Sequence, residues 1–237
     1  MNHADRTLTD ELLDPILAAD PAGPRITFYD DATGERVELS AITLANWAAK
    51  TANLVRDEFA LEPGSRVSVL LPAHWQTAAV LLGLWWAGAE VVLEADPDAD
   101  LAMVTADRLE DVEDVAEVAA LSLDAFGRPV PDLPVGITDY ATSVRVHGDQ
   151  FRSTVAGPAL GGRSVREVHA AAVDSASRQG FGGTDRALSS ADWNTTDDLI
   201  DGLVAVLAVG ASLVQVANPD PEKTERRNAT EKVTFPL

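Results

Sequence analysis

The stretch that decides the fold covers residues 66–94 and reads RVSVLLPAHWQTAAVLLGLWWAGAEVVLE. Residues 66–71 form a nearly continuous apolar run, which is typical of a buried strand in a parallel sheet. Residues 74–86 are apolar on nearly all sides and are followed by Gly88, which predicts a buried helix and its end. Residues 90–94 predict a second strand. The stretch therefore predicts a strand–helix–strand unit with parallel strands.

The flanking sequence continues this alternation of strands and helices. Upstream, apolar spacing predicts a helix over residues 9–19, a hairpin of residues 25–30 and 36–40, and a helix over 41–60. Downstream, the predicted strands are 102–105, 187–190 and 212–216, and the predicted helices are 111–121, 165–177 and 196–209. Residues 122–149 have no clear period and predict loops and weak strands.

This pattern predicts an α/β fold, with a mainly parallel sheet and helices on both of its faces. We expect a single domain over residues 1–217. Residues 218–237 are expected to form a polar C-terminal segment, because residues 218–228 carry no apolar face. Residues 231–235 have the composition of a strand and could add one to the sheet.

The charge of the chain excludes several classes of partner. Its 237 residues include 38 acidic and 18 basic side chains, giving a net charge of -20. Such a surface repels nucleic acid and anionic lipid, so we expect neither as a partner. With no cysteine there is no disulfide and no thiolate site. The amino terminus does not read as a signal peptide, which predicts a cytoplasmic protein.

No known catalytic or metal-binding motif is complete. Asp96-Pro-Asp-Ala-Asp100 begins like a calcium loop, but Leu101 stands where that loop needs glycine and Asp107 where it needs glutamate. Neither a nucleophile elbow nor a Walker sequence nor a dinucleotide-binding glycine pattern is present. We therefore assign no catalytic residue and no metal ligand from the sequence.

Two short motifs in a fixed order nevertheless resemble a known family. Pro63-Gly-Ser-Arg-Val67 is followed, after the apolar helix, by Ala87-Gly-Ala89 before a strand. This order is similar to the start of the adenylate-forming enzymes, which include acyl-CoA synthetases, luciferases and nonribosomal adenylation domains. Residues 184–190 and 203–216 resemble later segments of that family. The resemblance covers nearly the whole chain and implies the first subdomain of the AMP-binding domain.

The family's phosphate loop reads roughly Thr-Ser-Gly-Thr-Thr-Gly-x-Pro-Lys-Gly-Val and would fall on residues 155–165, if anchored on His169. Gly157 matches its first glycine and Arg163 stands at its lysine. Leu160 replaces a glycine of the loop. Residues without a hydroxyl group stand at the loop's hydroxyl positions: Val155, Ala156, Pro158 and Ala159. The hydroxyls that would cradle ATP phosphates are therefore mostly lost.

Six residues could still contact a phosphate group, as the resemblance implies. They are Gly157, Gly161, Gly162, Arg163, Ser164 and His169. The other interpretation of these residues is a purely structural loop, because glycine clusters alone are common in turns. The family's remaining adenylation motifs are expected beyond Leu237, so the chain alone is not expected to catalyse adenylation.

The sequence thus favours a non-catalytic binding or interaction module derived from an adenylate-forming enzyme, with no cofactor assigned. The alternative is the ATP-, AMP- or acyl-CoA-binding half of a split enzyme that a second chain completes. A third class is an unrelated small-molecule hydrolase on the same scaffold. We expect a protein partner or a homodimer, associating through Trp193 and the tail residues Val233, Phe235 and Leu237.

Overall fold

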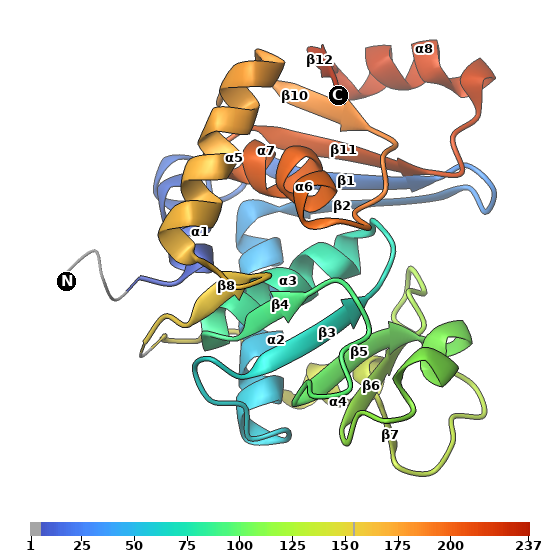
Figure 1. Cartoon of the computed structure of the whole chain (residues 1–237). Coiled ribbons are helices and arrows are strands. Elements are labelled where there is room, and N and C mark those ends of the chain that lie inside the picture. Colours follow the sequence, from blue (N-terminus) through green and yellow to red (C-terminus); the bar gives the residue numbers. More distant parts are fainter. Residues whose placement is uncertain (1–5, 154) are drawn as a thin grey trace. The chain divides into compact units, whose positions relative to one another are not determined.

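The computed structural model describes residues 6–153 and 155–237 (Figure 1). The chain divides into two compact units. Unit 1 holds the described residues of Met1–Asp10, Ala45–Leu71 and Ala79–Val165, and unit 2 holds Glu11–Leu44, Pro72–Ala78 and Arg166–Leu237. The sequence predicted one domain over residues 1–217; in the structure residues 218–237 are part of unit 2.

The described residues of unit 1 contain a seven-stranded sheet in the order β7-β6-β5-β3-β4-β8-β9. Its strands are β3 (Arg66–Leu70), β4 (Glu90–Val92), β5 (Leu101–Thr105), β6 (Val118–Leu121), β7 (Ile137–Asp139), β8 (Pro158–Leu160) and β9 (Arg163–Ser164). All neighbouring pairs are parallel except β8 and β9, which form an antiparallel hairpin. The predicted parallel pair on either side of the apolar helix is confirmed.

Two long helices contribute most of their length to unit 1: α2 (Ala41–Asp57) and α3 (Trp75–Ala87). Shorter helical segments in unit 1 are η2 (Ala106–Val112), α4 (Tyr140–Ser143) and η3 (Val144–Val146). Helix α3 is buried as predicted, with Leu82 0% exposed. Gly83 allows α2 and α3 to approach closely, because a Cβ there would lie 2.5 Å from Thr51 Cβ.

The helix predicted over residues 111–121 is wrong. The structure places strand β6 in its second half, paired in parallel with β5. Val118, Ala119, Ala120 and Leu121 are all buried, so this apolar run is held by the sheet on both sides. The acidic residues before it lie in the connection from η2, where they remain solvated. Tertiary burial, which local spacing does not report, decides this element.

The described residues of unit 2 contain a five-stranded sheet in the order β12-β10-β11-β1-β2. Its strands are β1 (Pro24–Asp30), β2 (Glu35–Ser40), β10 (Arg186–Ser189), β11 (Ser212–Ala217) and β12 (Phe235–Pro236). β1 and β2 form the predicted antiparallel hairpin, and the other neighbouring pairs are parallel. Both sheets are therefore mainly parallel, which confirms the predicted α/β fold.

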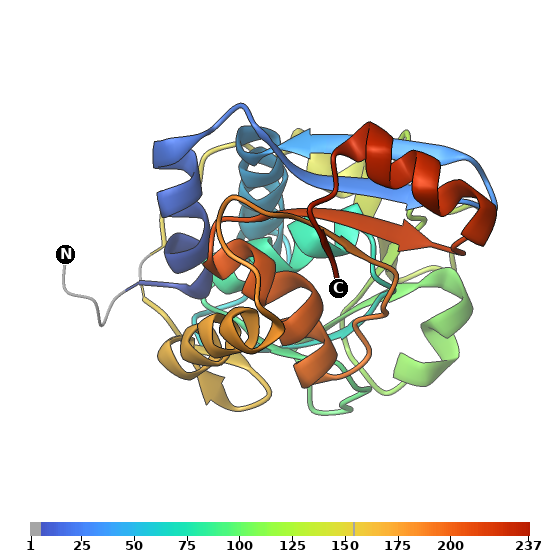
Figure 2. The same ribbon diagram turned by 90° about the horizontal axis from the view of Figure 1, so that it is seen from above.

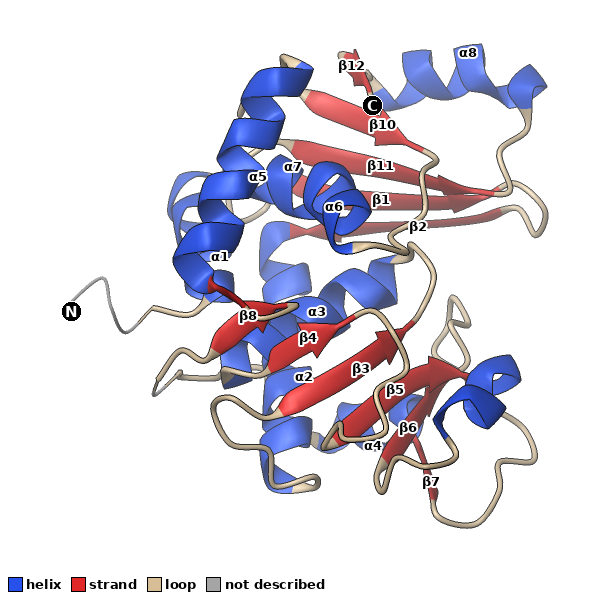
Figure 3. Cartoon of the chain, in the orientation of Figure 1, coloured by secondary structure: helices blue, strands red, loops and turns tan. Residues whose placement is uncertain are grey.

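The helices of unit 2 begin with α1 (Leu8–Ala19), most of which belongs to this unit. The others are α5 (Val165–Gln179), α6 (Thr196–Leu199), the π-helical turn η4 (Ile200–Val204), α7 (Ala205–Ala208) and α8 (Pro221–Glu231). Helices α5, α6 and α7 lie on the same face of this sheet, as Figures 2 and 3 show together. Within the described residues, no helix combines the length and the apolar character needed to cross a membrane.

Helix α8 was not predicted, because its sequence has no apolar face. Asp220 caps its first turn by accepting a hydrogen bond from the Glu222 N–H, and Pro221 opens it. The side chains that it buries are charged, namely Arg227 and Glu231. Arg227 forms an ion pair with Asp31, and Glu231 forms ion pairs with Arg36 and Arg186, so the buried contacts of this helix with the rest of unit 2 are made by charged side chains.

Of the residues expected to form an association surface, Trp193 is not available for one. Trp193 is only 2% exposed, and its indole lies against Gly202 of η4. Phe235 is half-buried and its ring centroid lies 5.5 Å from that of Phe181. Trp193 therefore belongs to the core of unit 2. Binding of a protein partner stays a prediction without this residue.

Candidate functional site

Five of the six predicted phosphate-contacting residues, all except His169, lie in or next to the β8–β9 hairpin. Gly161 and Gly162 form its turn with φ angles of 53° and 79°, in the left-handed region that glycine adopts without strain. Arg163 and Ser164 form β9, and both are exposed. The structure thus groups these four residues in unit 1. His169 is half-buried on helix α5 and belongs to unit 2.

The backbone N–H groups of this turn already have partners. Gly161 donates to the Val91 carbonyl oxygen at 2.9 Å. Gly162 donates to Glu90 Oε1 at 2.7 Å, and the Glu90 carboxylate is nearly buried. The other oxygen of Glu90 accepts a hydrogen bond from Arg66 Nε at 3.3 Å. A carboxylate of the protein therefore occupies an N–H group that a bound phosphate would need.

Gly157 has a packing role in the same region. A Cβ at this position would run into the Gly88 carbonyl oxygen and lie 2.7 Å from the Gly64 nitrogen. This space is too small for any side chain, and the neighbours are backbone atoms that cannot move aside. Gly157 is thus explained by close approach of three backbone segments, without reference to a ligand.

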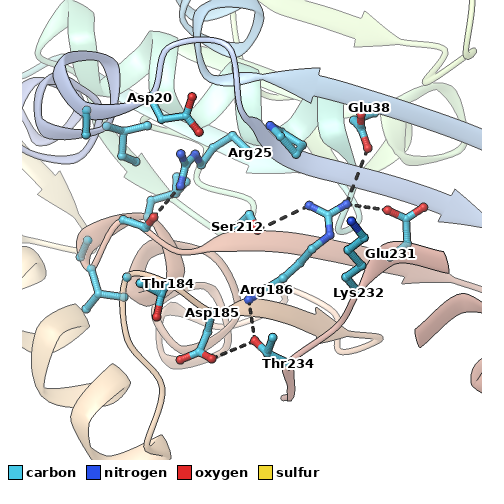
Figure 4. A pocket seen from close by; sticks show the side chains of 18 of the residues that line it. Asp20, Arg25, Glu38, Thr184, Asp185, Arg186, Ser212, Glu231, Lys232 and Thr234 are labelled. Carbon is cyan, nitrogen blue, oxygen red and sulfur yellow. Dashed lines mark hydrogen bonds and ion pairs between the residues drawn. The ribbon is translucent and has the colours of Figure 1, made fainter. Parts of the chain in front are cut away.

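A second candidate site is a cavity of about 830 Å³ in unit 2 (Figure 4). It lies at the amino ends of the parallel strands β1, β10 and β11, where Arg25, Arg186 and Ser212 are found. Four basic residues line it: Arg25, Arg36, Arg186 and Lys232. The four acidic residues that line it are Asp20, Glu38, Asp185 and Glu231.

Two of these cations are neutralised within the protein. Arg186 donates to Glu231 Oε2 at 2.5 Å, and Arg36 Nε donates to Glu231 Oε1 at 3.0 Å. Arg36 also pairs with Glu38 at 2.8 Å. The Tyr29 hydroxyl donates to Glu231 as well. Burial alone would raise the pKa of Glu231, but these hydrogen bonds outweigh burial, and the pKa lies below its usual range.

Arg25 is held differently. It is 6% exposed, and its Nη1 donates to the carbonyl oxygens of Gly210 at 2.5 Å and Ala211 at 2.9 Å. Its Nε is buried without a hydrogen-bond partner, and no carboxylate in the described part of the chain forms an ion pair with it. Burial lowers the pKa of Arg25, while the nearby charge of Asp20 acts in the opposite direction. A guanidinium nevertheless stays charged at neutral pH.

The other acids of the cavity serve as backbone or hydroxyl acceptors. Asp20 accepts from the Gly23 N–H at 2.9 Å, and Asp185 accepts from the Gly182 N–H and the Thr234 hydroxyl, each at 2.8 Å. Lys232 is exposed and makes no ion pair with any described residue. Among residues 6–153 and 155–237, no group of three His, Asp or Glu side chains is arranged to hold a metal ion.

Sequence reasoning missed the cavity residues, since they come from segments far apart in the chain. Arg25 stands one residue before the apolar run Ile26-Thr-Phe28, which gives a basic residue at the start of a buried strand. A basic residue also begins the later strand, at Arg186. This repeated placement of arginine at strand starts was the available signal.

The chain was compared with family models and with known proteins. No family model matches the sequence, but a known protein does. A Mycobacterium tuberculosis protein named "TIGR03089 family protein" is 61% identical over 236 residues, which is 96% of this chain and 97% of that protein. The chain belongs to the TIGR03089 family. This membership alone assigns no activity to the chain.

Solved structures similar to this TIGR03089 chain are larger enzymes. A Brucella canis acyl-CoA synthetase matches with a TM-score of 0.81 and 18% identity over 98% of this chain, and the match covers 47% of the synthetase. The anthranilate CoA ligase AuaEII, solved with anthranoyl-AMP, matches with a TM-score of 0.72 and 14% identity over 90% of this chain, covering 45% of the ligase. The chain spans about half the length of these enzymes. The predicted likeness to the adenylate-forming fold is confirmed.

Proposed function

We propose that the chain is a cytoplasmic, non-catalytic binding module built on the fold of the adenylate-forming enzymes. The observation that carries the proposal is the carboxylate of Glu90 on the Gly162 N–H at 2.7 Å. ATP binding at this hairpin would have to displace a nearly buried carboxylate and then hold phosphate charge beside it. Both steps cost free energy, because like charges repel strongly where water is excluded.

The residues before the turn support the same conclusion. Pro158 has no N–H group to offer, and the Ala159 carbonyl oxygen accepts a hydrogen bond from Trp85 Nε1 at 2.8 Å. Neither residue has a side-chain hydroxyl. The β8–β9 segment is therefore bonded to its own unit, as an ordinary sheet edge would be, rather than left open around a ligand.

One observation favours the alternative function as the nucleotide-binding half of a two-chain enzyme. Arg163 is exposed on β9, at the position that the family resemblance gives to the lysine of the phosphate loop. A guanidinium at this position could contact phosphate oxygens from outside the hairpin. This contact would not require the N–H groups of Gly161 and Gly162.

Nucleotide binding separates the two functions, because the half of a split enzyme would bind ATP or AMP even without the second chain, and ATP–pyrophosphate exchange tests for activity of the chain alone. We expect the purified chain to give no exchange above background with a panel of carboxylic acids. ATP and AMP are also expected to leave its melting temperature unchanged, whereas a ligand at 100 times its Kd would stabilise by about 2.7 kcal/mol. Arg163→Ala should be indistinguishable from wild type in both assays.

The matched control is Arg152→Ala, since Arg152 is also exposed and precedes the hairpin. Exchange or ATP stabilisation that Arg163→Ala abolishes and Arg152→Ala preserves would contradict the non-catalytic function and support the two-chain enzyme.

A further inference from the structure

We infer that the cavity of unit 2 binds a small molecule with one anionic oxygen group and an apolar remainder. The inference deepens the proposed function, because it gives the binding module a site and a class of ligand. The shared chemistry is that of a carboxylate or a phosphate ester, whose oxygens accept the hydrogen bonds that guanidinium and ammonium groups donate.

The first argument is the state of Arg25. A guanidinium has five N–H donors, and within the described chain this one uses only Nη1, on two carbonyl oxygens. Its Nε is buried with no hydrogen-bond partner. A buried cation that forms no ion pair is costly, even with the charge of Asp20 nearby, and a buried donor without a hydrogen bond requires an explanation such as a bound ligand. The same side chain lines the cavity of about 830 Å³, so such a ligand has room to bind.

The second argument is the contrast with the neighbouring cations. Arg36 and Arg186 surround Glu231 and Glu38, so this part of the cavity needs no external anion. Lys232 lacks any such carboxylate in the described chain. Figure 4 shows Arg25 on one side of the cavity and Lys232, beside Arg186, on the other. Arg25 and Lys232 are therefore the two lining cations that form no ion pair with a described residue.

The third argument concerns the rest of the ligand. The lining of the cavity includes apolar residues of α1 and of the end of α7, namely Pro15, Ile16, Ala19, Leu207, Ala208 and Val209. It also includes the hydroxyl-bearing residues Thr184, Ser212 and Thr234. An apolar lining together with a fixed cation selects an amphipathic anion over a fully hydrated inorganic ion.

The acidic residues of the cavity limit the charge of the ligand. Glu38 and Glu231 form ion pairs with arginine, whereas Asp20 and Asp185 form no ion pair with any described residue and accept only from backbone N–H or hydroxyl groups. These two carboxylates repel a multiply charged molecule such as a nucleoside triphosphate. A single anionic group close to Arg25 fits the balance better.

Isothermal titration of the whole chain with hexanoate, hexyl phosphate and hexanamide tests the inference. These probes share one apolar tail and differ in their head group. We expect at least one of the two anions to bind about tenfold more tightly than hexanamide. The anion that binds identifies the source of the oxygen chemistry.

Two variants locate the binding. Arg25→Gln should weaken anion binding at least about tenfold, since it removes the charge of the anchoring side chain. Lys232→Asn should weaken it about threefold without perturbing the fold, because asparagine tolerates the left-handed φ of 53° at this position. Lys223→Gln, which removes the same charge from α8 outside this cavity, is the matched control and should stay within twofold of wild type.

Urea unfolding shows whether Arg25→Gln still folds, and if it does not, Lys232→Asn decides. Anions that bind no better than hexanamide would overturn the inference. So would anion binding that both variants leave unchanged. Nucleotide binding at the hairpin together with anion binding that depends on Arg25 would contradict the proposed function but leave this inference intact.

Discussion

The β8–β9 hairpin of unit 1 and the cavity of unit 2 differ in whether their hydrogen-bond donors have partners within the protein. At the hairpin, the glycine turn resembles a phosphate loop in sequence, yet its N–H groups are bonded to Val91 and Glu90. In the cavity no motif stands out in the sequence, yet the buried guanidinium of Arg25 forms no ion pair with a described residue and its Nε has no hydrogen-bond partner. An anion site is therefore better recognised by donors without partners than by the presence of glycines.

The two sites differ because of the positions from which their carboxylates reach the donors. Glu90 begins β4, and the sheet register places it directly beside Arg66 of β3 and near the hairpin turn. In unit 2 helix α8 brings Glu231 to Arg36 of β2 and Arg186 of β10, while Arg25 donates to the carbonyl oxygens after α7. The hairpin site thus follows from strand pairing, and the cavity follows from strand pairing together with the docking of α8.

The largest expected effect tests whether the hairpin region is a packing feature. Gly157→Ala should lower the free energy of unfolding by about 3 kcal/mol, because the new methyl group meets backbone atoms of Gly88 and Gly64. Urea unfolding followed by circular dichroism measures this loss. Gly182→Ala is the control: its Cβ would have no atom within 4 Å, so the change should stay within about 0.5 kcal/mol. Equal losses in the two variants would remove the packing explanation for Gly157.

The next effect concerns the neutralised side of the cavity. Glu231→Gln should cost about 2 kcal/mol at pH 7, because two arginines lose a nearly buried charged acceptor. The folded-state pKa of Glu231 lies below its usual value, so its stabilising contribution is complete above the unfolded pKa of about 4.3. That contribution is lost as the pH falls through the folded pKa. Unfolding curves at pH 7 and pH 3.5 should therefore show the difference between wild type and variant shrinking in acid.

The pH dependence also shows whether Glu231→Gln destabilises the protein by removing a charge or by altering the hydrogen-bond geometry. A loss that is the same size at both pH values would show that Glu231→Gln acts through altered hydrogen-bond geometry. The buried Asp31–Arg227 pair is present in both proteins, so its own titration cancels from the difference.

The strand–helix–strand unit could be predicted because its apolar runs alone identify each of its three elements. Residues 66–94 contain two buried strands and a helix whose burial is nearly uniform, and each shows in the spacing of apolar residues. Strand β6 and helix α8 were mispredicted since their state depends on distant partners. Val118–Leu121 needs its neighbouring strand, and α8 needs Asp31 to receive Arg227.

The two candidate sites differ in predictability for the same reason. The hairpin residues are contiguous from Gly157 to Ser164, so alignment with a loop motif groups them from the sequence alone. Arg25, Arg186 and Lys232 come from different strands and the end of a helix, and only the parallel register of the sheet brings them to one cavity. No local pattern carries that register.

A smaller effect tests whether the Glu90 carboxylate prevents ATP from binding at the hairpin. Glu90→Gln should cost about 1 kcal/mol, because an uncharged amide oxygen is a weaker acceptor for Gly162 and Arg66 than a carboxylate. Thermal and urea unfolding measure it, with Glu94→Gln as the exposed control that should change nothing. If ATP stabilises Glu90→Gln but not wild type, the Glu90 charge alone closes the hairpin. If ATP stabilises neither, the hydrogen bonds of the hairpin backbone are sufficient.

The smallest expected effect concerns the charge of Asp20, which lies near Arg25 in the cavity. Asp20 acts on Arg25 through its charge without forming an ion pair, and it also accepts a hydrogen bond from the Gly23 N–H. The substitution Asp20→Asn keeps that acceptor oxygen, so we expect a stability change within about 0.5 kcal/mol. Removing the repelling charge should make the anion that binds in the cavity bind about twofold more tightly, in the same titration. Weaker binding would instead mean that Asp20 positions Arg25, in which case the guanidinium has its carboxylate after all and the contrast between the two sites fails.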